Sequence, residues 1–323
     1  MDDSFSRVGS TRTLPSILEH TAQLFALGTV VSFVPITTGY QDYNVELTTT
    51  NGKYVVKIFA ADRSKQRIDD VIRAHTASAK LRLPVPGLLE TADKRKLIDI
   101  PGKTHPIYLC VFEYFPGKPF TRTPVTDTDL VTLTRTMSAI HRIQGVIHPY
   151  YDSLGIINLP EEFKTKKSAL NSDELTAITP VVTKLGKINL SLFPRSIIHG
   201  TFEKENILKS ATGEICILDF GCMDYQASIL DIATFIANFT LYVDTTKRSA
   251  IIRTILDTYE EKRPLTKDEI AALPTLIRSQ FAAYAIGMSY HMRIEHDMTK
   301  QTQTWLDRGW DGLRAYAAVK KIL

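Results

Sequence analysis

The pattern of apolar residues changes near residue 113, and this change restricts the folds open to the chain. Before it, short apolar runs rich in β-branched and aromatic residues predict strands, at 30–34, 43–47, 54–59, 96–100 and 107–112. After it, apolar residues recur mostly at helical spacing, in the segments 127–143, 173–185, 229–242, 247–261, 267–291 and 302–321. Strands gathered in one part of a chain and helices in the rest are typical of α+β proteins. We therefore expect an α+β fold.

Local signals add detail to this prediction. Asn51-Gly52 lies between two of the expected strands and is the strongest short hairpin signal. Helical spacing at 15–27 and 63–81 predicts two helices among the strands. Two further short strands, 206–208 and 216–219, flank a turn. The first part of the chain is thus expected to be a small antiparallel sheet with helices beside it.

Composition and charge limit the partners. The chain has 323 residues, enough for one large two-lobed domain or two ordinary ones, and 44% of them are apolar. Its net charge of +4 is mild and no long basic run occurs, so we expect no nucleic-acid partner. Three cysteines without a Cys-x-x-Cys spacing favour neither a disulfide framework nor a zinc site.

The N-terminal sequence predicts a cytoplasmic location. It lacks a cationic segment leading into an apolar core and a small-residue cleavage site. The apolar stretch 24–36 is too short to span a bilayer and contains Gly28 and Pro35. No membrane partner is expected.

Two polar motifs lie close together near the middle of the chain. Residues 197–208 read Ile-Ile-His-Gly-Thr-Phe-Glu-Lys-Glu-Asn-Ile-Leu, and Leu-Asp-Phe-Gly follows at 218–221. Asp219 comes thirteen residues after Asn206, and their side-chain oxygens are ligands that suit Mg²⁺. This spacing resembles the catalytic loop and metal loop of kinase-fold phosphotransferases.

Further matches extend the resemblance over about residues 30–320, to the aminoglycoside phosphotransferase and choline kinase superfamily. They occur in the family's order at plausible separations: Lys57 on a strand, a hinge-like segment from Glu113 to Gly117, His199-Gly200 with Asn206, Asp219-Phe220-Gly221, and Asp231 twelve residues after Asp219. The resemblance implies a protein-kinase-like, two-lobed fold. Its parts would be an N-terminal segment and helix (1–29), a nucleotide-binding N-lobe (30–113), and a C-lobe with the catalytic loop, metal loop and substrate-binding helices (114–323).

The family's roles map onto individual residues. The resemblance implies ATP or GTP as phosphoryl donor, with Mg²⁺ bound by Asn206 and Asp219. Lys57 would contact the α- and β-phosphates. The main chain at Glu113 and Phe115 would bind adenine.

Three further sites complete this assignment. Gly39, the single glycine of a degenerate phosphate loop, would approach the phosphates through backbone amides. His199 and Asp231 would brace the catalytic loop as structural support. In kinases a helix glutamate holds the strand lysine, and Asp69 or Asp70 is the candidate here, with a solvated helix face as the equal alternative.

Thr201 departs from the family pattern. Its place in the catalytic loop belongs to an aspartate that orients the attacking hydroxyl, and a threonine is no base near neutral pH. Glu203 is a possible substitute base, although a solvated loop charge is the simpler interpretation of it. The reaction also tolerates a weak base, because the transition state is loose. Alternatively, the protein is a nucleotide-binding pseudokinase with a regulatory or binding role.

The resemblance favours a small-molecule phosphotransferase over a scaffold, since Lys57, Asn206 and Asp219 occur together. The expected acceptor is a hydroxyl of an amino alcohol or an aminoglycoside-like substrate. Several residues of the C-terminal part would suit a cationic acceptor, although exposed helix charges are the simpler interpretation of each: Asp224, Glu260, Glu261, Glu295 and Asp297, with Tyr290 and His291.

Overall fold

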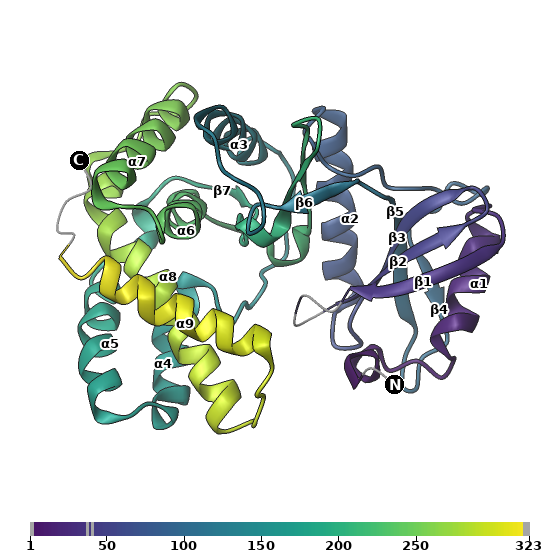
Figure 1. Ribbon diagram of the computed structural model, residues 1–323, viewed down its shortest axis with the longest axis horizontal. Helices are drawn as coiled ribbons and strands as arrows, with labels where there is room; N and C mark the ends of the chain where they lie inside the picture. The colour runs from purple at the N-terminus through teal and green to yellow at the C-terminus, as the bar shows by residue number, and fades with distance from the viewer. Residues whose placement is uncertain (1–2, 37–38, 40–41, 319–323) are drawn as a thin grey trace. The chain divides into compact units, whose positions relative to one another are not determined.

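The computed structural model describes residues 3–36, 39 and 42–318, and it has the α+β fold expected from the sequence. The chain divides into two compact units (Figure 1). The first comprises Met1–Lys118 with Leu208–Leu218, and the second comprises Pro119–Ile207 with Asp219–Leu323. No helix in the described ranges is long and apolar enough to cross a membrane.

An antiparallel five-stranded sheet forms the centre of the first unit. Its strand order is β1-β2-β3-β5-β4, with β1 at Val30–Ile36, β2 at Tyr43–Thr49, β3 at Gly52–Ile58, β4 at Ile98–Ile100 and β5 at Ile107–Glu113. The predicted hairpin is present, because Thr49 pairs with Gly52 across Thr50 and Asn51. Helix α1 (Leu14–Leu24) buries Ile17 and Leu18 in one hydrophobic cluster with residues of β2, β3, β4 and β5.

Two smaller elements complete the first unit. Helix α2 (Lys65–Lys80) starts at Ser64, whose side chain accepts a hydrogen bond from the Arg67 amide. A three-stranded sheet has the order β6-β8-β9, with β6 at Gly117–Pro119, β8 at Ile207–Ser210 and β9 at Ile215–Ile217.

The second unit is mainly helical. Its helices are α3 (Asp127–Ile140), α4 (Leu159–Lys166), α5 (Ser172–Leu185), α6 (Ile229–Thr240), α7 (Thr245–Glu260), α8 (Lys267–Arg293) and α9 (Lys300–Ala315). Every residue of α6 is buried, so this helix is the core of the unit. Helix α9 crosses α8 and packs on it (Figure 1). The two-stranded sheet of β7 (Arg195–Ile198) and β10 (Asp224–Ala227) lies before α6 in sequence and carries the segments that hold the site.

His75, on the buried face of α2, gives the first unit a pH-dependent stability. Its Nε2 lies 2.7 Å from the Pro86 carbonyl oxygen, and its ring meets the Phe112 ring edge to face. Burial lowers the pKa of His75 to about 4, against 6.5 in an unfolded chain. As the pH falls, His75 is therefore protonated in the unfolded state before it is protonated in the folded state. Its contribution to the free energy of unfolding is fully present above pH 6.5 and is lost as the pH falls towards 4.

We expect acidification from pH 7 to 5 to destabilise the wild type through His75 by about 2 kcal/mol. The His75→Gln variant has no imidazole to protonate, so its melting temperature should fall less over this range. Thermal unfolding of both proteins at pH 5, 6 and 7 measures the difference. Parallel declines in the two proteins would contradict a role for His75.

Candidate functional site

The loop after β7 is folded by hydrogen bonds among its own residues. The amide of Glu203 donates to the Thr201 carbonyl at 2.8 Å, and the amide of Asn206 donates to the Glu203 carbonyl at 3.1 Å. Gly200 has a φ of +85°, and a Cβ there would lie 2.3 Å from the carbonyl oxygen of Cys222. A side chain at position 200 would therefore force this loop away from the segment that follows Asp219.

Asp231, in the first turn of α6, anchors the start of the loop. Its Oδ2 accepts hydrogen bonds from the His199 amide at 2.7 Å and from His141 Nε2 at 3.0 Å, and its Oδ1 accepts one from the Gly200 amide at 2.9 Å. Burial opposes ionisation of Asp231, but the His141 hydrogen bond and the two nearby imidazoles outweigh it and hold its pKa below the usual value. The carboxylate is therefore ionised and fixes two consecutive amides.

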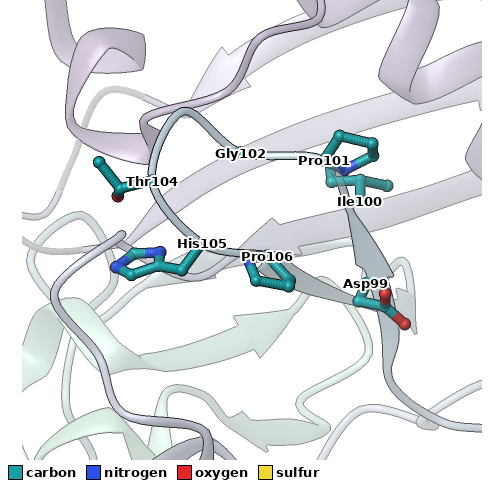
Figure 2. Close-up of a pocket in the computed structure, with 7 residues that line it drawn as sticks. All are labelled: Asp99, Ile100, Pro101, Gly102, Thr104, His105 and Pro106. Atoms are coloured by element: carbon teal, nitrogen blue, oxygen red, sulfur yellow. The ribbon is translucent and has the colours of Figure 1, made fainter.

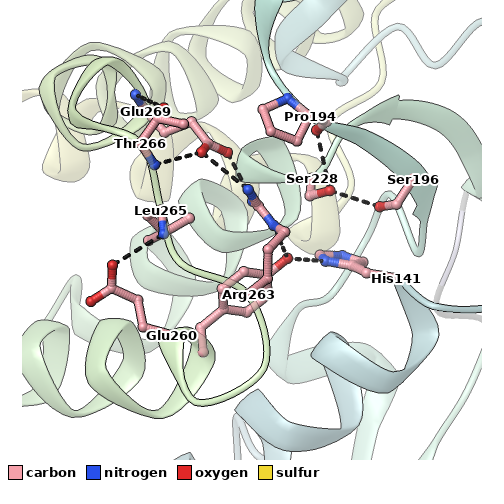
Figure 3. A network of polar contacts seen from close by, with 10 residues as sticks. His141, Pro194, Ser196, Ser228, Glu260, Arg263, Leu265, Thr266 and Glu269 are labelled. Atoms are coloured by element: carbon pink, nitrogen blue, oxygen red, sulfur yellow. Dashed lines mark hydrogen bonds and ion pairs between the residues drawn. The ribbon is translucent and has the colours of Figure 1, made fainter.

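His141 supplies a contact that the sequence analysis did not assign to any role. It follows the last residue of α3, and its Nδ1 lies 2.7 Å from the Tyr259 hydroxyl. Figure 3 shows the continuation of this network through Arg263, which forms an ion pair with Glu269 at 2.8 Å. His199 contacts Asp231 through its main-chain amide. The ring of His199 lies against the rings of Phe202 and Phe220.

Asn206 and Asp219 offer oxygen atoms that fit Mg²⁺. Asn206 donates its Nδ2 to the Thr201 carbonyl at 3.1 Å, which leaves Oδ1 as the amide atom available to a cation. Asp219 has a φ of +59° and accepts the Gly221 amide on Oδ1 at 3.0 Å. No cluster of three or more His, Cys, Asp or Glu side chains suited to a metal occurs in the described ranges. An amide and a carboxylate with phosphate oxygens match the preference of Mg²⁺ for few protein ligands.

Thr201 lies half-buried at the position of the expected base. Its carbonyl accepts two hydrogen bonds, while its hydroxyl makes none among the described residues. The main chain of Thr201 is thus fixed by hydrogen bonds, but its side chain has no group that could act as a base near neutral pH.

Glu203 is 6% exposed and is directed into the second unit. Its Oε1 accepts a hydrogen bond from the Tyr284 hydroxyl of α8 at 2.5 Å. Burial and the neighbouring Glu205 raise the pKa of Glu203 to about 8, against the opposing effects of Tyr284 and Arg308. The simple interpretation of Glu203 as a solvated loop charge is therefore wrong.

In the first unit Lys57 is almost fully buried on β3 and has an ion pair that the sequence analysis did not anticipate. Its Nζ lies 3.0 Å from Oδ2 of Asp42, the residue before β2. The Oδ1 of Asp42 accepts from Arg63 Nε at 2.8 Å and from the Ala60 amide at 3.1 Å. Asp42 therefore links β3, through Lys57, to Ala60 and Arg63 in the segment that follows this strand.

The two helix carboxylates considered for Lys57 have different surroundings. Asp69 is partly exposed and pairs with Lys65 at 2.5 Å, so it is not the lysine partner. Asp70 is fully buried and pairs with Arg73, and its contact with Lys57 stays a prediction.

The other nucleotide-binding residues also stay predictions. Gly39 has a φ of +113°, whereas residues 37, 38, 40 and 41 of the expected phosphate loop lie outside the described residues. Glu113 ends β5 and donates its amide to the Gly87 carbonyl at 2.8 Å. The Phe115 carbonyl accepts the Gly117 amide at 2.9 Å.

A hollow in the second unit brings one expected acceptor residue close to the catalytic loop. Its walls include Asp152, Gly200, Asp224 and Gln226. Asp224 is 7% exposed and accepts from Gln226 Nε2 at 3.0 Å. Another hollow, in the first unit, is formed by the loop between β4 and β5 and contains none of the expected site residues (Figure 2).

The remaining acceptor candidates have partners of their own. Glu260 accepts the Leu265 amide, as Figure 3 shows, and Glu261 pairs with Arg135 at 3.1 Å. Glu295 pairs with His291 at 2.5 Å. Asp297 accepts the Thr302 hydroxyl at 2.6 Å at the start of α9. These side chains hold helix ends and surfaces, and Asp224 is the carboxylate of the set that lines the hollow.

The sequence and the fold were compared with those of known proteins. The model of the APH phosphotransferase enzyme family matches residues 32–266. A homoserine kinase of Methylobacillus flagellatus is 23% identical over 262 residues, which cover 79% of this chain and 78% of that protein. An amicoumacin kinase in complex with AMP-PNP, Ca²⁺ and its ligand superposes with a TM-score of 0.70 at 17% identity, covering 100% and 97% of the two chains. A microcompartment-associated aminopropanol kinase gives a TM-score of 0.67 at 15% identity, covering 91% and 94%.

The Asp42→Asn variant should be strongly destabilised, because Lys57 and Arg63 would lose their shared buried carboxylate. Breaking a buried ion pair on one side costs about 3–5 kcal/mol. Glu46→Gln is the control, since it removes a more exposed ion pair, between Glu46 of β2 and Lys53 of β3, which is worth about 1 kcal/mol or less. Denaturant unfolding of the three proteins tests this expectation. Equal losses in both variants would mean that Asp42 has no special role.

Proposed function

Since the chain belongs to the APH phosphotransferase enzyme family, whose members transfer phosphoryl groups to alcohols, we propose that it phosphorylates the hydroxyl of a small amino alcohol or an aminoglycoside-like molecule. The donor is ATP or GTP. The observation that carries this proposal is the catalytic loop, in which Asp231 fixes two amides and Asn206 presents its amide oxygen. Phosphoryl transfer depends chiefly on such positioning and on charge neutralisation.

Each nucleotide-binding residue has a specific task in this proposal. Lys57 neutralises charge on the α- and β-phosphates, and Asn206 and Asp219 hold Mg²⁺ by their oxygens. These two residues would hold the cation, which would supply positive charge beside the phosphate oxygens. The main chain at Glu113 and Phe115 binds the adenine edge, and the backbone at Gly39 approaches the phosphates.

The acceptor is proposed to carry an amine. The names of two similar proteins, homoserine kinase and aminopropanol kinase, denote molecules with both an amine and a hydroxyl. Asp224 and Asp152 both line the hollow beside Gly200. An ammonium group would interact with their carboxylates more favourably than an uncharged substituent would.

Base catalysis is proposed to be weak, because Thr201 replaces a carboxylate. Positioned bases contribute about 10²–10⁴-fold, so slow transfer survives without one. Glu203 is the alternative proton acceptor, two residues further along the loop. With a pKa of about 8 and a buried carboxyl, it is mostly protonated at pH 7 and directed at Tyr284, which disfavours that role.

A nucleotide-binding protein with a regulatory or binding role is the second candidate function. Thr201 favours it, because the hydroxyl cannot orient an acceptor by charge. Catalytic turnover distinguishes the two candidates, since both bind nucleotide.

Thr201→Asp should raise kcat by about 10²–10⁴-fold with an amino-alcohol acceptor, because the restored carboxylate orients and deprotonates the hydroxyl. Thr201→Asn is the control of equal size without the charge and should give no gain. The assay follows ADP or GDP release with each donor and a panel of amino alcohols. If neither wild type nor Thr201→Asp turns over any acceptor, while Mg²⁺-nucleotide still raises the melting temperature, the second candidate replaces the kinase.

Asp224→Asn should raise KM for an amino alcohol about tenfold or more, since a charge-assisted contact with the ammonium group is worth roughly 1.5–3 kcal/mol. The matching diol, which lacks the amine, should show the same KM with both proteins. Steady-state kinetics with the two acceptors, in the Thr201→Asp background if required, measure the ratio. An equal rise for amine and diol would place the effect of Asp224 on the fold rather than on amine recognition.

A further inference from the structure

The second half of the catalytic loop is attached to helices that follow it by about 80–100 residues in the sequence. Tyr284 of α8 donates its hydroxyl hydrogen to Glu203 at 2.5 Å. Arg308 of α9 donates from Nη2 to Oε1 of Glu205, also at 2.5 Å. Asn238 of α6 joins the two attachments, because its Nδ2 donates to the Tyr284 hydroxyl at 3.1 Å and its Oδ1 accepts from Arg308 Nη1 at 3.2 Å.

Aromatic packing rigidifies these polar contacts. The guanidinium carbon of Arg308 lies 4.2 Å from the centre of the Trp305 ring, and the Tyr284 ring meets Trp305 edge to face at 4.7 Å. Tyr284 is 1% exposed and Arg308 is 9% exposed. Polar groups so buried are costly unless their hydrogen bonds are made, so the network has little freedom to rearrange.

The network reaches the part of the loop that contains Thr201 and Asn206. The Glu203 amide donates to Thr201 and its carbonyl accepts the Asn206 amide, while Glu205 directly precedes Asn206. Asp231 fixes the loop at His199 and Gly200, at its other end. Displacing Glu203 or Glu205 would therefore move the main chain on which the Asn206 side chain depends.

We propose that Tyr284 and Arg308 are positioning residues, which hold the Asn206 end of the catalytic loop from α8 and α9 through Glu203 and Glu205. The consequence for catalysis rests on the proposed function, whereas the consequence for the loop itself does not. The two glutamates are thus tethers of the loop, and neither needs to contact a substrate.

The second unit contains a matched pair of control residues. Tyr316 is fully buried and its hydroxyl contacts Thr240, and Arg248 is 9% exposed, with its guanidinium 4.6 Å from the Tyr316 ring. Arg248 bonds the carbonyls of Ala315 and Val243, which lie outside the catalytic loop. Tyr316→Phe and Arg248→Lys therefore match Tyr284→Phe and Arg308→Lys in burial and chemistry.

The first measurement is hydrogen–deuterium exchange of the peptide that covers residues 199–208, in the nucleotide-free protein. Tyr284→Phe and Arg308→Lys should speed exchange there by about tenfold, as local opening becomes easier. The control variants should leave this peptide unchanged while altering their own surroundings. Unchanged exchange in Tyr284→Phe and Arg308→Lys, or an equal effect of all four variants, would overturn the proposal.

The second measurement separates positioning from nucleotide affinity. In an active background, Tyr284→Phe and Arg308→Lys should lower kcat by about 10- to 100-fold with little change in the KM of the nucleotide. The control variants Tyr316→Phe and Arg248→Lys should keep the kcat of the parent protein, even where their melting temperatures fall as much as those of Tyr284→Phe and Arg308→Lys. If neither wild type nor Thr201→Asp turns over and Mg²⁺-nucleotide gives no thermal shift, both candidate functions are refuted. The exchange result would still decide whether α8 and α9 hold the loop.

Discussion

The carboxylate of Asp231 is the interaction on which the arrangement of the site depends. It lies in the first turn of α6, where the helix dipole favours a negative charge, and it binds the amides of two consecutive loop residues. The third donor is His141, so α3 also contributes to the anchor. Because α6 is buried on every side, the loop start inherits the rigidity of the core. A protonated or displaced Asp231 would release His199 and Gly200 together.

Two buried carboxyls, one on α6 and one in the loop after β7, have opposite electrostatic environments. Asp231 is surrounded by donors and two imidazoles, and its pKa is lowered despite burial. Glu203 has one hydroxyl donor and two acidic neighbours, Glu205 and Asp152, and its pKa is raised to about 8. Arg308 opposes this rise without cancelling it, because it pairs directly with Glu205. The first carboxyl therefore serves as a fixed charge, whereas the second behaves at pH 7 as a largely neutral polar link.

Local sequence patterns could predict most of the large elements, because strand alternation, the Asn51-Gly52 turn and helical spacing are short-range signals. Helix α4 and the strands β6, β7 and β10 are absent from the prediction, because segments of three to eight residues give too few periods to recognise unless a turn signal marks them, as it does between β8 and β9. The residues predicted for the site come from motifs, and their roles stay predictions; the side chains that contact them could not be predicted. Asp42 lies in the degenerate phosphate loop, whose sequence assigns it no role. Tyr284 and Arg308 meet the catalytic loop only after α8 and α9 have packed, which no local pattern encodes.

Thr201, at the place where the family resemblance leads us to expect an aspartate, has to be considered together with the contacts that the loop makes. Buried ion pairs and buried polar networks are often replaceable by apolar residues at no loss of stability, and sometimes with a gain. Asp231 with His141, and Arg308 with the partly exposed Glu205, are therefore costly ways to fold a loop whose geometry serves no purpose. Together they hold the main chain at Gly200 and beside Asn206, two positions to which the proposed function assigns a part in phosphoryl transfer. Under the proposed assignment of Thr201 to the place of an aspartate, a loop that keeps this positioning argues for a function that still requires the loop in one shape.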